Sequence, residues 1–287
     1  MNEASQKAYE QIRSGGLGYY ETRRGLVAVW GGEAVQFLDG LITNDVKTLG
    51  DGEQMLAAFP NAQGRLLAVV RVRRDGDRFL IETEEATREK VFQNLFRFTF
   101  AGDFFVEDLS DQFRYLETFG AEPPASAGGL MFAGRSTGYF APHDRPLPDG
   151  PIPISDELYE TLRIESGVPK FGIDMDETTI VPELGIDGLI SYNKGCYIGQ
   201  EIIARIHFRG HVAKQLTGLV STDGLGPGNE LTSPECKPAG RITSVTFSPK
   251  LGKTIALAYV RYDFLAPGTE LLAGETRAEV SELPFVR

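Results

Sequence analysis

The sequence predicts an α+β protein that ends in a small β-barrel or sandwich, on three observations. The 287 residues are too many for one simple core, so two domains or three small ones are expected. In the first half, segments with helical spacing stand between strand-like segments, in the order strand, helix, strand, strand. From residue 214 onward, short strand-like segments alternate with turn signals. We therefore expect residues 1–213 to form two α+β subdomains and residues 214–287 a C-terminal barrel.

The elements of the first half follow from their spacing and their breakers. Gly31 and Gly32 end an apolar run with β-branched members, which is typical of a strand, and apolar residues at helical spacing follow them. Gly64 marks a turn between two strand-like segments and so predicts a hairpin. The expected strands are residues 26–30, 55–59, 66–72, 78–82, 104–108 and 114–119. The expected helices are residues 33–41 and 84–98.

The middle of the chain holds a connection and two further helices. Residues 121–153 are rich in Pro, Gly and Ala, which predicts loops with a short strand or two. Ser155 is placed to cap a helix that begins with two acidic residues and ends near Ser166, before a Gly and a Pro. Residues 200–208 form an amphipathic run and predict another helix.

Composition limits the possible partners. A net charge of −11 repels phosphate backbones, so direct strong binding to nucleic acid is not expected. No apolar run approaches the ~20 residues that span a bilayer, and the polar N-terminus lacks the pattern of a signal peptide, so no membrane partner and a cytoplasmic protein are expected. Cys196 and Cys236 are too few for a disulfide framework, and a cytosol keeps them reduced.

The octet K-G-C-Y-I-G-Q-E at residues 194–201 is the most unusual stretch. Cys196 lies between two glycines, two residues after Lys194 and just before the predicted helix. A helix N-terminus and an ammonium both favour a thiolate, so Cys196 and Lys194 are the candidate reactive pair. The alternatives are a small buried cysteine in a tight loop and a surface lysine.

This octet resembles the K-G-C-Y-x-G-Q-E signature of YgfZ-type proteins, which are relatives of the glycine-cleavage T-protein, GcvT. Three further segments resemble the family in the same order: F-L-D-G-L-I-T-N-D-V at residues 37–46, N-A-Q-G-R at 61–65 and R-I-E-S-G-V-P at 163–169. The resemblance covers nearly the whole chain. It implies three subdomains arranged as a cloverleaf around a channel that binds tetrahydrofolate.

The resemblance also implies a set of folate contacts. Glu165 matches the family glutamate that grips the pterin, and Tyr159 falls where YgfZ proteins can carry a stacking Trp. Tyr197 of the octet is expected at the same site. Arg205 or Arg209, in the most basic short stretch of the chain, is expected to meet the anionic tail. The alternatives are that Glu165 is an exposed acid, that Tyr159 is a core residue, and that Arg205 and Arg209 belong to a solvated basic helix end.

Other positions depart from the family or add little. GcvT carries an aspartate pair where this chain has Ala68 and Val69, and no acid nearby in the sequence replaces it, so aminomethyltransferase activity is not expected. Arg24 falls near the place of another family Trp. His207 and His211 have metal-ligand spacing but no clustered partners, so no metal site is expected.

YgfZ-type proteins support assembly or repair of [4Fe–4S] clusters, including that of a radical-SAM enzyme that thiolates tRNA. The resemblance thus implies iron–sulfur client enzymes or assembly proteins as partners, with Cys196 handling a cluster, sulfur or a client thiol. Two alternatives stay open: a folate-dependent one-carbon transferase, and an enzyme with a cysteine nucleophile and a histidine base. In the first reading, Glu165 and Cys196 border one shared cavity.

Overall fold

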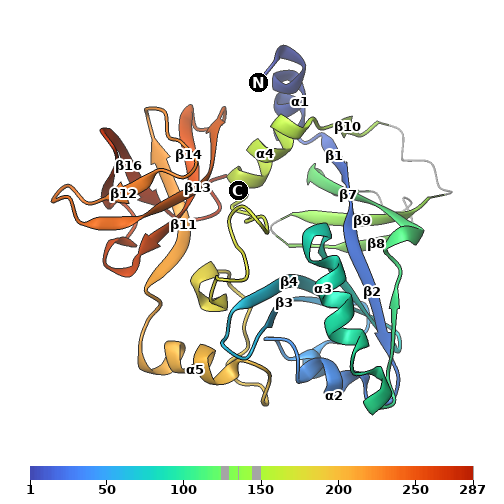
Figure 1. The fold of residues 1–287 in the computed structure, drawn as a ribbon. Coiled ribbons are helices and arrows are strands. Elements are labelled where there is room, and N and C mark those ends of the chain that lie inside the picture. The colour runs from blue at the N-terminus through green and yellow to red at the C-terminus, as the bar shows by residue number, and fades with distance from the viewer. Residues whose placement is uncertain (124–128, 135, 144–149, 287) are drawn as a thin grey trace.

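The computed structural model describes residues 1–123, 129–134, 136–143 and 150–286, and these form three parts around a central region (Figure 1). Two parts are built on five-stranded sheets, and the third is a closed barrel of six strands. The predicted α+β class with a C-terminal barrel is confirmed. No helix among the described residues is long and apolar enough to cross a membrane.

The first sheet has the strand order β10-β1-β7-β9-β8. Its strands are β1 (Leu17–Thr22), β7 (Phe113–Gly120), β8 (Leu130–Phe132), β9 (Thr137–Pro142) and β10 (Ile152–Pro153). Helix α4 (Asp156–Glu165) packs beside it and begins as predicted, because the Ser155 side chain accepts a hydrogen bond from the backbone N–H of Leu158. Helix α1 (Glu3–Arg13), which the sequence analysis missed, buries Tyr9 and Ile12 against α4.

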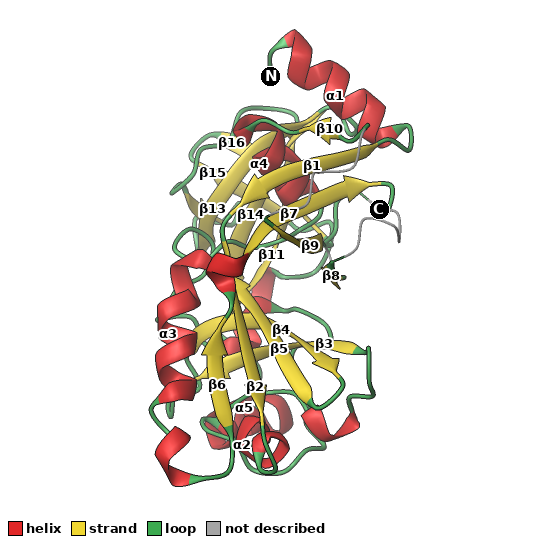
Figure 2. Cartoon of the chain, turned by 90° about the vertical axis from the view of Figure 1, so that its right-hand side faces the viewer, coloured by secondary structure: helices red, strands yellow, loops and turns green. Residues whose placement is uncertain are grey.

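The second sheet has the strand order β3-β4-β5-β2-β6. Its strands are β2 (Arg24–Trp30), β3 (Gln54–Pro60), β4 (Leu66–Asp75), β5 (Arg78–Glu84) and β6 (Phe105–Asp108). Leu26 and Ala28 of β2 pack against the first sheet, whereas Val27 and Val29 join the core under helices α2 (Ala34–Asp39) and α3 (Glu85–Phe96). Because both faces of β2 are covered, it reads as a continuous apolar run. Figure 2 shows α3 along one side of this sheet.

The barrel closes in the order β11-β14-β13-β12-β15-β16. Its strands are β11 (Lys214–Ser221), β12 (Glu230–Thr232), β13 (Pro238–Ser248), β14 (Lys253–Arg261), β15 (Glu270–Ala273) and β16 (Thr276–Ser281). Helix α4 lies against β13 and β14, so it joins the barrel to the first sheet (Figure 1).

A long irregular segment, residues 166–199, runs from α4 to helix α5 (Gln200–Arg209). Met175, Val181 and Leu184 of this segment are buried against Ala58 of β3 and Leu66 of β4. The segment is therefore part of the core and not a surface linker. It carries the octet and, as described next, one wall of the central cavity.

Candidate functional site

A cavity of about 460 Å³ lies where the second sheet, β7, α4 and the segment after α4 meet. Apolar side chains from the second sheet and from the segment after α4 form much of its wall: Met55, Leu56, Val69, Val70, Val168, Pro169, Met175 and Ile186. Cavities of this size with apolar walls and a few polar groups are the usual form of a small-molecule site. The polar groups therefore decide what can bind.

Glu82 and two arginines form a buried ionic cluster at this cavity. The Glu82 carboxylate lies 2.5 Å from Nε of Arg24 and 2.6 Å from Nε of Arg71. Burial opposes the charge on Glu82, but the two guanidinium groups outweigh it and lower its pKa to about 2. Arg71 also donates to the carbonyls of Phe132 and Ser136, so its guanidinium is well satisfied. Each oxygen of the Glu82 carboxylate therefore already accepts from an arginine at the cavity wall.

Glu117 and Tyr159 contribute a second polar pair. The Tyr159 hydroxyl donates to one carboxylate oxygen of Glu117 at 3.1 Å. The other oxygen has no hydrogen-bond partner among the described residues, although Glu117 is 3% exposed. Tyr159 lines the cavity, but Tyr20 stacks on its ring with centroids 4.0 Å apart. One face of Tyr159 is therefore already covered.

Glu84 brings another acid to the cavity from the end of β5. It is the cross-strand partner of Arg24, and both of its oxygens accept from the backbone N–H of Phe171, at 3.2 and 3.1 Å. Burial raises the pKa of the Glu84 carboxyl group. No acid near Val69 in the sequence replaces the family's aspartate pair, but the fold brings Glu84 and Asp187 to the same cavity as Val69.

Glu165 does not line this cavity. Its side chain is fully buried and accepts from the Tyr9 hydroxyl at 2.7 Å, and it also bonds to Arg13 and Ser248. These contacts join α1, the end of α4 and the barrel. The expectation that Glu165 and Cys196 border one cavity is wrong, since neither belongs to its described lining.

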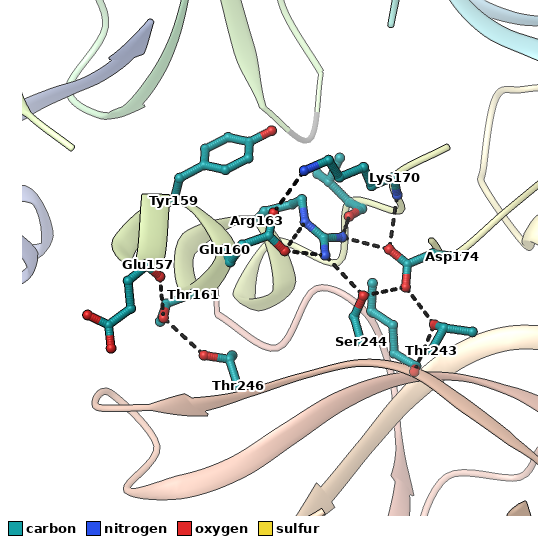
Figure 3. A network of polar contacts seen from close by, with 12 residues as sticks. Glu157, Tyr159, Glu160, Thr161, Arg163, Lys170, Asp174, Thr243, Ser244 and Thr246 are labelled. Atoms are coloured by element: carbon teal, nitrogen blue, oxygen red, sulfur yellow. Dashed lines mark hydrogen bonds and ion pairs between the residues drawn. The ribbon is translucent and has the colours of Figure 1, made fainter. Parts of the chain in front are cut away.

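Arg163 of the same family segment has a structural network of its own (Figure 3). Its guanidinium donates to Asp174 at 2.8 Å, to Ser244 at 3.0 Å and to Glu160 at 2.7 Å. The side chains of Arg163 and Asp174 are 1% and 0% exposed. The pair ties α4 to the segment that follows it and to the barrel strand β13.

The Cys196 loop is held on the second sheet with its thiol outside. Cys196 is a free, exposed cysteine, and the next residue but one, Ile198, donates its backbone N–H to the carbonyl of Gly40 at 3.1 Å. Gly199 has φ of +81°, and a Cβ there would lie 2.4 Å from the carbonyl oxygen of Asn61. Glycine is required at 199 because the loop presses directly on the hairpin turn.

Lys194 points inward and anchors the loop. Its ammonium donates to the carbonyls of Asp39, Ile42 and Asn44 at 2.8, 2.9 and 2.7 Å, and lies 3.1 Å from the Asp39 carboxylate. Its side chain is 0% exposed, and burial lowers the pKa of its ammonium group. The structure thus places Lys194 as a support for the position of Cys196, not as an open cation beside the sulfur.

Replacing Lys194 by Met should lower the free energy of unfolding by about 2–3 kcal/mol, because buried carbonyls lose their donor. The matched control is Lys47→Met. Lys47 also pairs with Asp39, but 54% of its side chain is exposed, so its loss should cost much less stability than the loss of Lys194. Chemical denaturation of both variants measures the difference. Equal losses would contradict the anchoring role.

The remaining predicted residues lie outside the cavity. Tyr197 is buried in the core of the segment, where burial raises the pKa of its hydroxyl to about 12. Arg205 and Arg209 are exposed on α5 and do not contribute to the described lining. His207 and His211 stack on tyrosine rings, and the described residues include no group of three or more side chains placed to hold a metal.

The sequence analysis did not assign Glu84 or Glu117 to the cavity, and it placed Arg24 only near a family Trp position, without a role of its own. In the structure Glu82 and Glu84 stand two residues apart in β5, which puts two acids on one face of the sheet, but the predicted strand ended at residue 82 and Glu84 opened the predicted helix. That alternation was the available signal. No sequence signal placed Glu117 at the cavity, because its position beside the second sheet depends on how the two sheets pack.

Comparisons with known proteins place the fold. Residues 214–287 match the model of the glycine cleavage T-protein C-terminal barrel domain. The crystal structure of the glycine cleavage system aminomethyltransferase T from Bartonella henselae superimposes with a TM-score of 0.83 at 19% identity, covering 97% of this chain and 89% of that one. The chain therefore has a GcvT-like fold with a T-protein barrel.

Two sequence relatives carry names that describe different functions. An aminomethyltransferase of Rubrobacter xylanophilus is 29% identical over 97% of this chain and 85% of its own. A mitochondrial homolog of the iron–sulfur cluster assembly factor IBA57 from Mycosarcoma maydis is 29% identical over 68% of this chain and 55% of its own.

Proposed function

We propose that this protein binds tetrahydrofolate in the central cavity. The observation that carries the proposal is the combination of apolar walls with the carboxylates of Glu117 and Glu84 in one buried space. A pterin ring is flat, with apolar faces and a row of N–H donors along one edge. Carboxylates accept such paired donors well, and apolar side chains pack on the faces. The residues present therefore fit the ring.

The cavity offers fewer contacts to the anionic tail of folate than to its ring. Lys170 lines the cavity and is 3.3 Å from Glu160, so part of its charge is already compensated. We propose Lys170 as the tail contact in place of Arg205 and Arg209, which lie on α5 and outside the lining. A cation of this kind attracts the carboxylates of a folate tail.

We further propose that the folate-bound protein supports assembly or repair of iron–sulfur clusters in the cytoplasm, and through them tRNA modification. The similarity to an IBA57 homolog and the exposed Cys196 support this. A thiolate is a natural ligand for iron and an exchange group for sulfur. The clusters are cargo in this proposal, and client enzymes or assembly proteins are the partners.

Cys196→Ala should abolish this support while the affinity for tetrahydrofolate stays unchanged. The reason is that the thiol is exposed on its loop and the cavity lies elsewhere. The measurement is the activity of [4Fe–4S] enzymes in cells that depend on this chain, with calorimetry of folate binding beside it. Cys236→Ala is the matched control, because Cys236 is the second free, exposed cysteine of the chain. Full rescue by the Cys196 variant would refute the thiol role.

A folate-dependent one-carbon transferase is the second candidate, and Glu84 favours it. Its carboxyl group lines the cavity, and burial raises its pKa, which is the direction in which enzymes shift a carboxyl group that serves as a general acid or base. The similarity to aminomethyltransferases agrees with this candidate. Product analysis with labelled methylene-tetrahydrofolate separates the two: turnover that Glu84→Gln removes would support the transferase.

A further inference from the structure

This inference rests on the proposed folate site. We propose that Arg24 is a specificity-determining residue of that site and donates hydrogen bonds to the 4-oxo group of the bound pterin. Its ligand class is then a 2-amino-4-oxo ring, and a ring with an amino group at position 4 is disfavoured.

The hydrogen bonds of Arg24 leave part of its guanidinium unused. Nε donates to Glu82, but neither Nη group has a hydrogen-bond partner among the described residues. Neither Nη atom is a fully buried polar atom without a hydrogen-bond partner in the described chain, and 20% of the Arg24 side chain is accessible to solvent. Arg24 lines the cavity, so a bound ligand can reach these donors.

The other cations of the cavity are already engaged. Arg71 donates to Glu82, to two carbonyls and to Tyr115. Arg163 is held by Glu160, Asp174 and Ser244, and the Lys170 ammonium lies near Glu160. Arg24 is therefore the cation of the described lining with the most unused donors. A bound ligand would cover these donors, and a covered donor without an acceptor is costly, so the ligand is expected to supply one.

The neighbours of Arg24 match the order of groups on the ring edge. Arg24 and Glu84 are cross-strand partners on β2 and β5, and Glu117 of β7 lines the same cavity. A 2-amino-4-oxo ring presents two N–H donors, at the 2-amino group and N3, followed by the 4-oxo acceptor. A carboxylate beside a guanidinium complements that sequence. Because a guanidinium has donors and no acceptor, a 4-amino group would meet it donor to donor.

The test measures binding of two probes by calorimetry: folic acid, which is 4-oxo, and aminopterin, which is 4-amino. Arg24→Met removes all donors at nearly constant length. The ratio of the aminopterin dissociation constant to the folic acid dissociation constant should fall by roughly tenfold or more in this variant. Folic acid loses a hydrogen bond from a charged donor, and aminopterin loses an unfavourable donor-to-donor contact. The ratio in the variant is compared with the ratio in the wild type, so any difference between the two rings in how they contact the carboxylates cancels.

Controls keep the outcomes separate. Arg78→Met removes a surface arginine paired with Asp75 and should leave the ratio unchanged. If Arg24→Met does not fold, Arg24→Gln is measured instead, since its amide can donate to a 4-oxo or accept from a 4-amino group and should also lose the discrimination. An unchanged ratio in a folded Arg24 variant overturns the inference and leaves folate binding intact. A wild-type protein that binds neither probe, nor tetrahydrofolate, overturns the proposed function itself.

Discussion

Val69→Trp should weaken tetrahydrofolate binding by roughly 100-fold or more, the equivalent of about 3 kcal/mol. Val69 lines the apolar wall of the central cavity from strand β4. An indole at this position takes up space that the ring of the ligand needs. Calorimetric titration of the folded variant measures the effect.

Val69→Ala is the matched control for this prediction, because it enlarges the same wall. Its affinity for tetrahydrofolate should stay within about threefold of wild type, since about one apolar contact is lost. Thermal unfolding confirms that both variants keep the fold. A folded Val69→Trp protein that binds as tightly as wild type would place the ligand outside the cavity.

Arg163→Met should cost about 3–5 kcal/mol of stability and lower Tm by roughly 5–15 °C. Arg163 lies 2.8 Å from Asp174, and the side chains of both residues are almost wholly buried (Figure 3). Without the guanidinium, the carboxylate of Asp174 remains buried without a cation. Differential scanning calorimetry measures the loss.

The double variant Arg163→Met, Asp174→Asn tests the reason for this loss. The amide oxygen at 174 can keep accepting from Thr243 and Ser244, which lie 2.5 and 2.6 Å from Asp174, and the amide carries no unpaired charge. Its NH2 group faces the backbone N–H of Lys170, a smaller cost than a buried unpaired carboxylate. The double variant should therefore be more stable than Arg163→Met alone. A double variant that is less stable than the single one would show that charge pairing is not the cause.

Local signals predicted much of the fold. The Ser155 cap predicted the start of α4, and the apolar run at 26–30 predicted β2, because each depends on neighbours in the sequence. Helix α1 was missed since its polar composition hides a narrow apolar stripe. Its signal was present at Asn2, which accepts from the backbone N–H of Ser5 at 2.8 Å as an N-cap.

The candidate site was predicted less well, for a physical reason. Glu165 is an acid near a helix end, and such a position does not reveal whether tertiary partners will take up its charge. Tyr9 and Arg13, which do so, lie more than 150 residues away. Glu117 and Glu84 come from different sheets, and their meeting depends on how those sheets pack. Sequence spacing carries no information about that packing.

A crystal structure of the protein with tetrahydrofolate tests the central claim most directly. The predicted result is a pterin ring in the cavity beside Val69, with its donor edge on Glu117 or Glu84 and its 4-oxo group toward Arg24. Cys196 should be far from direct contact with the ring. A ring bound at another surface, or one held by Glu165 after α1 has moved away, would contradict the assignment.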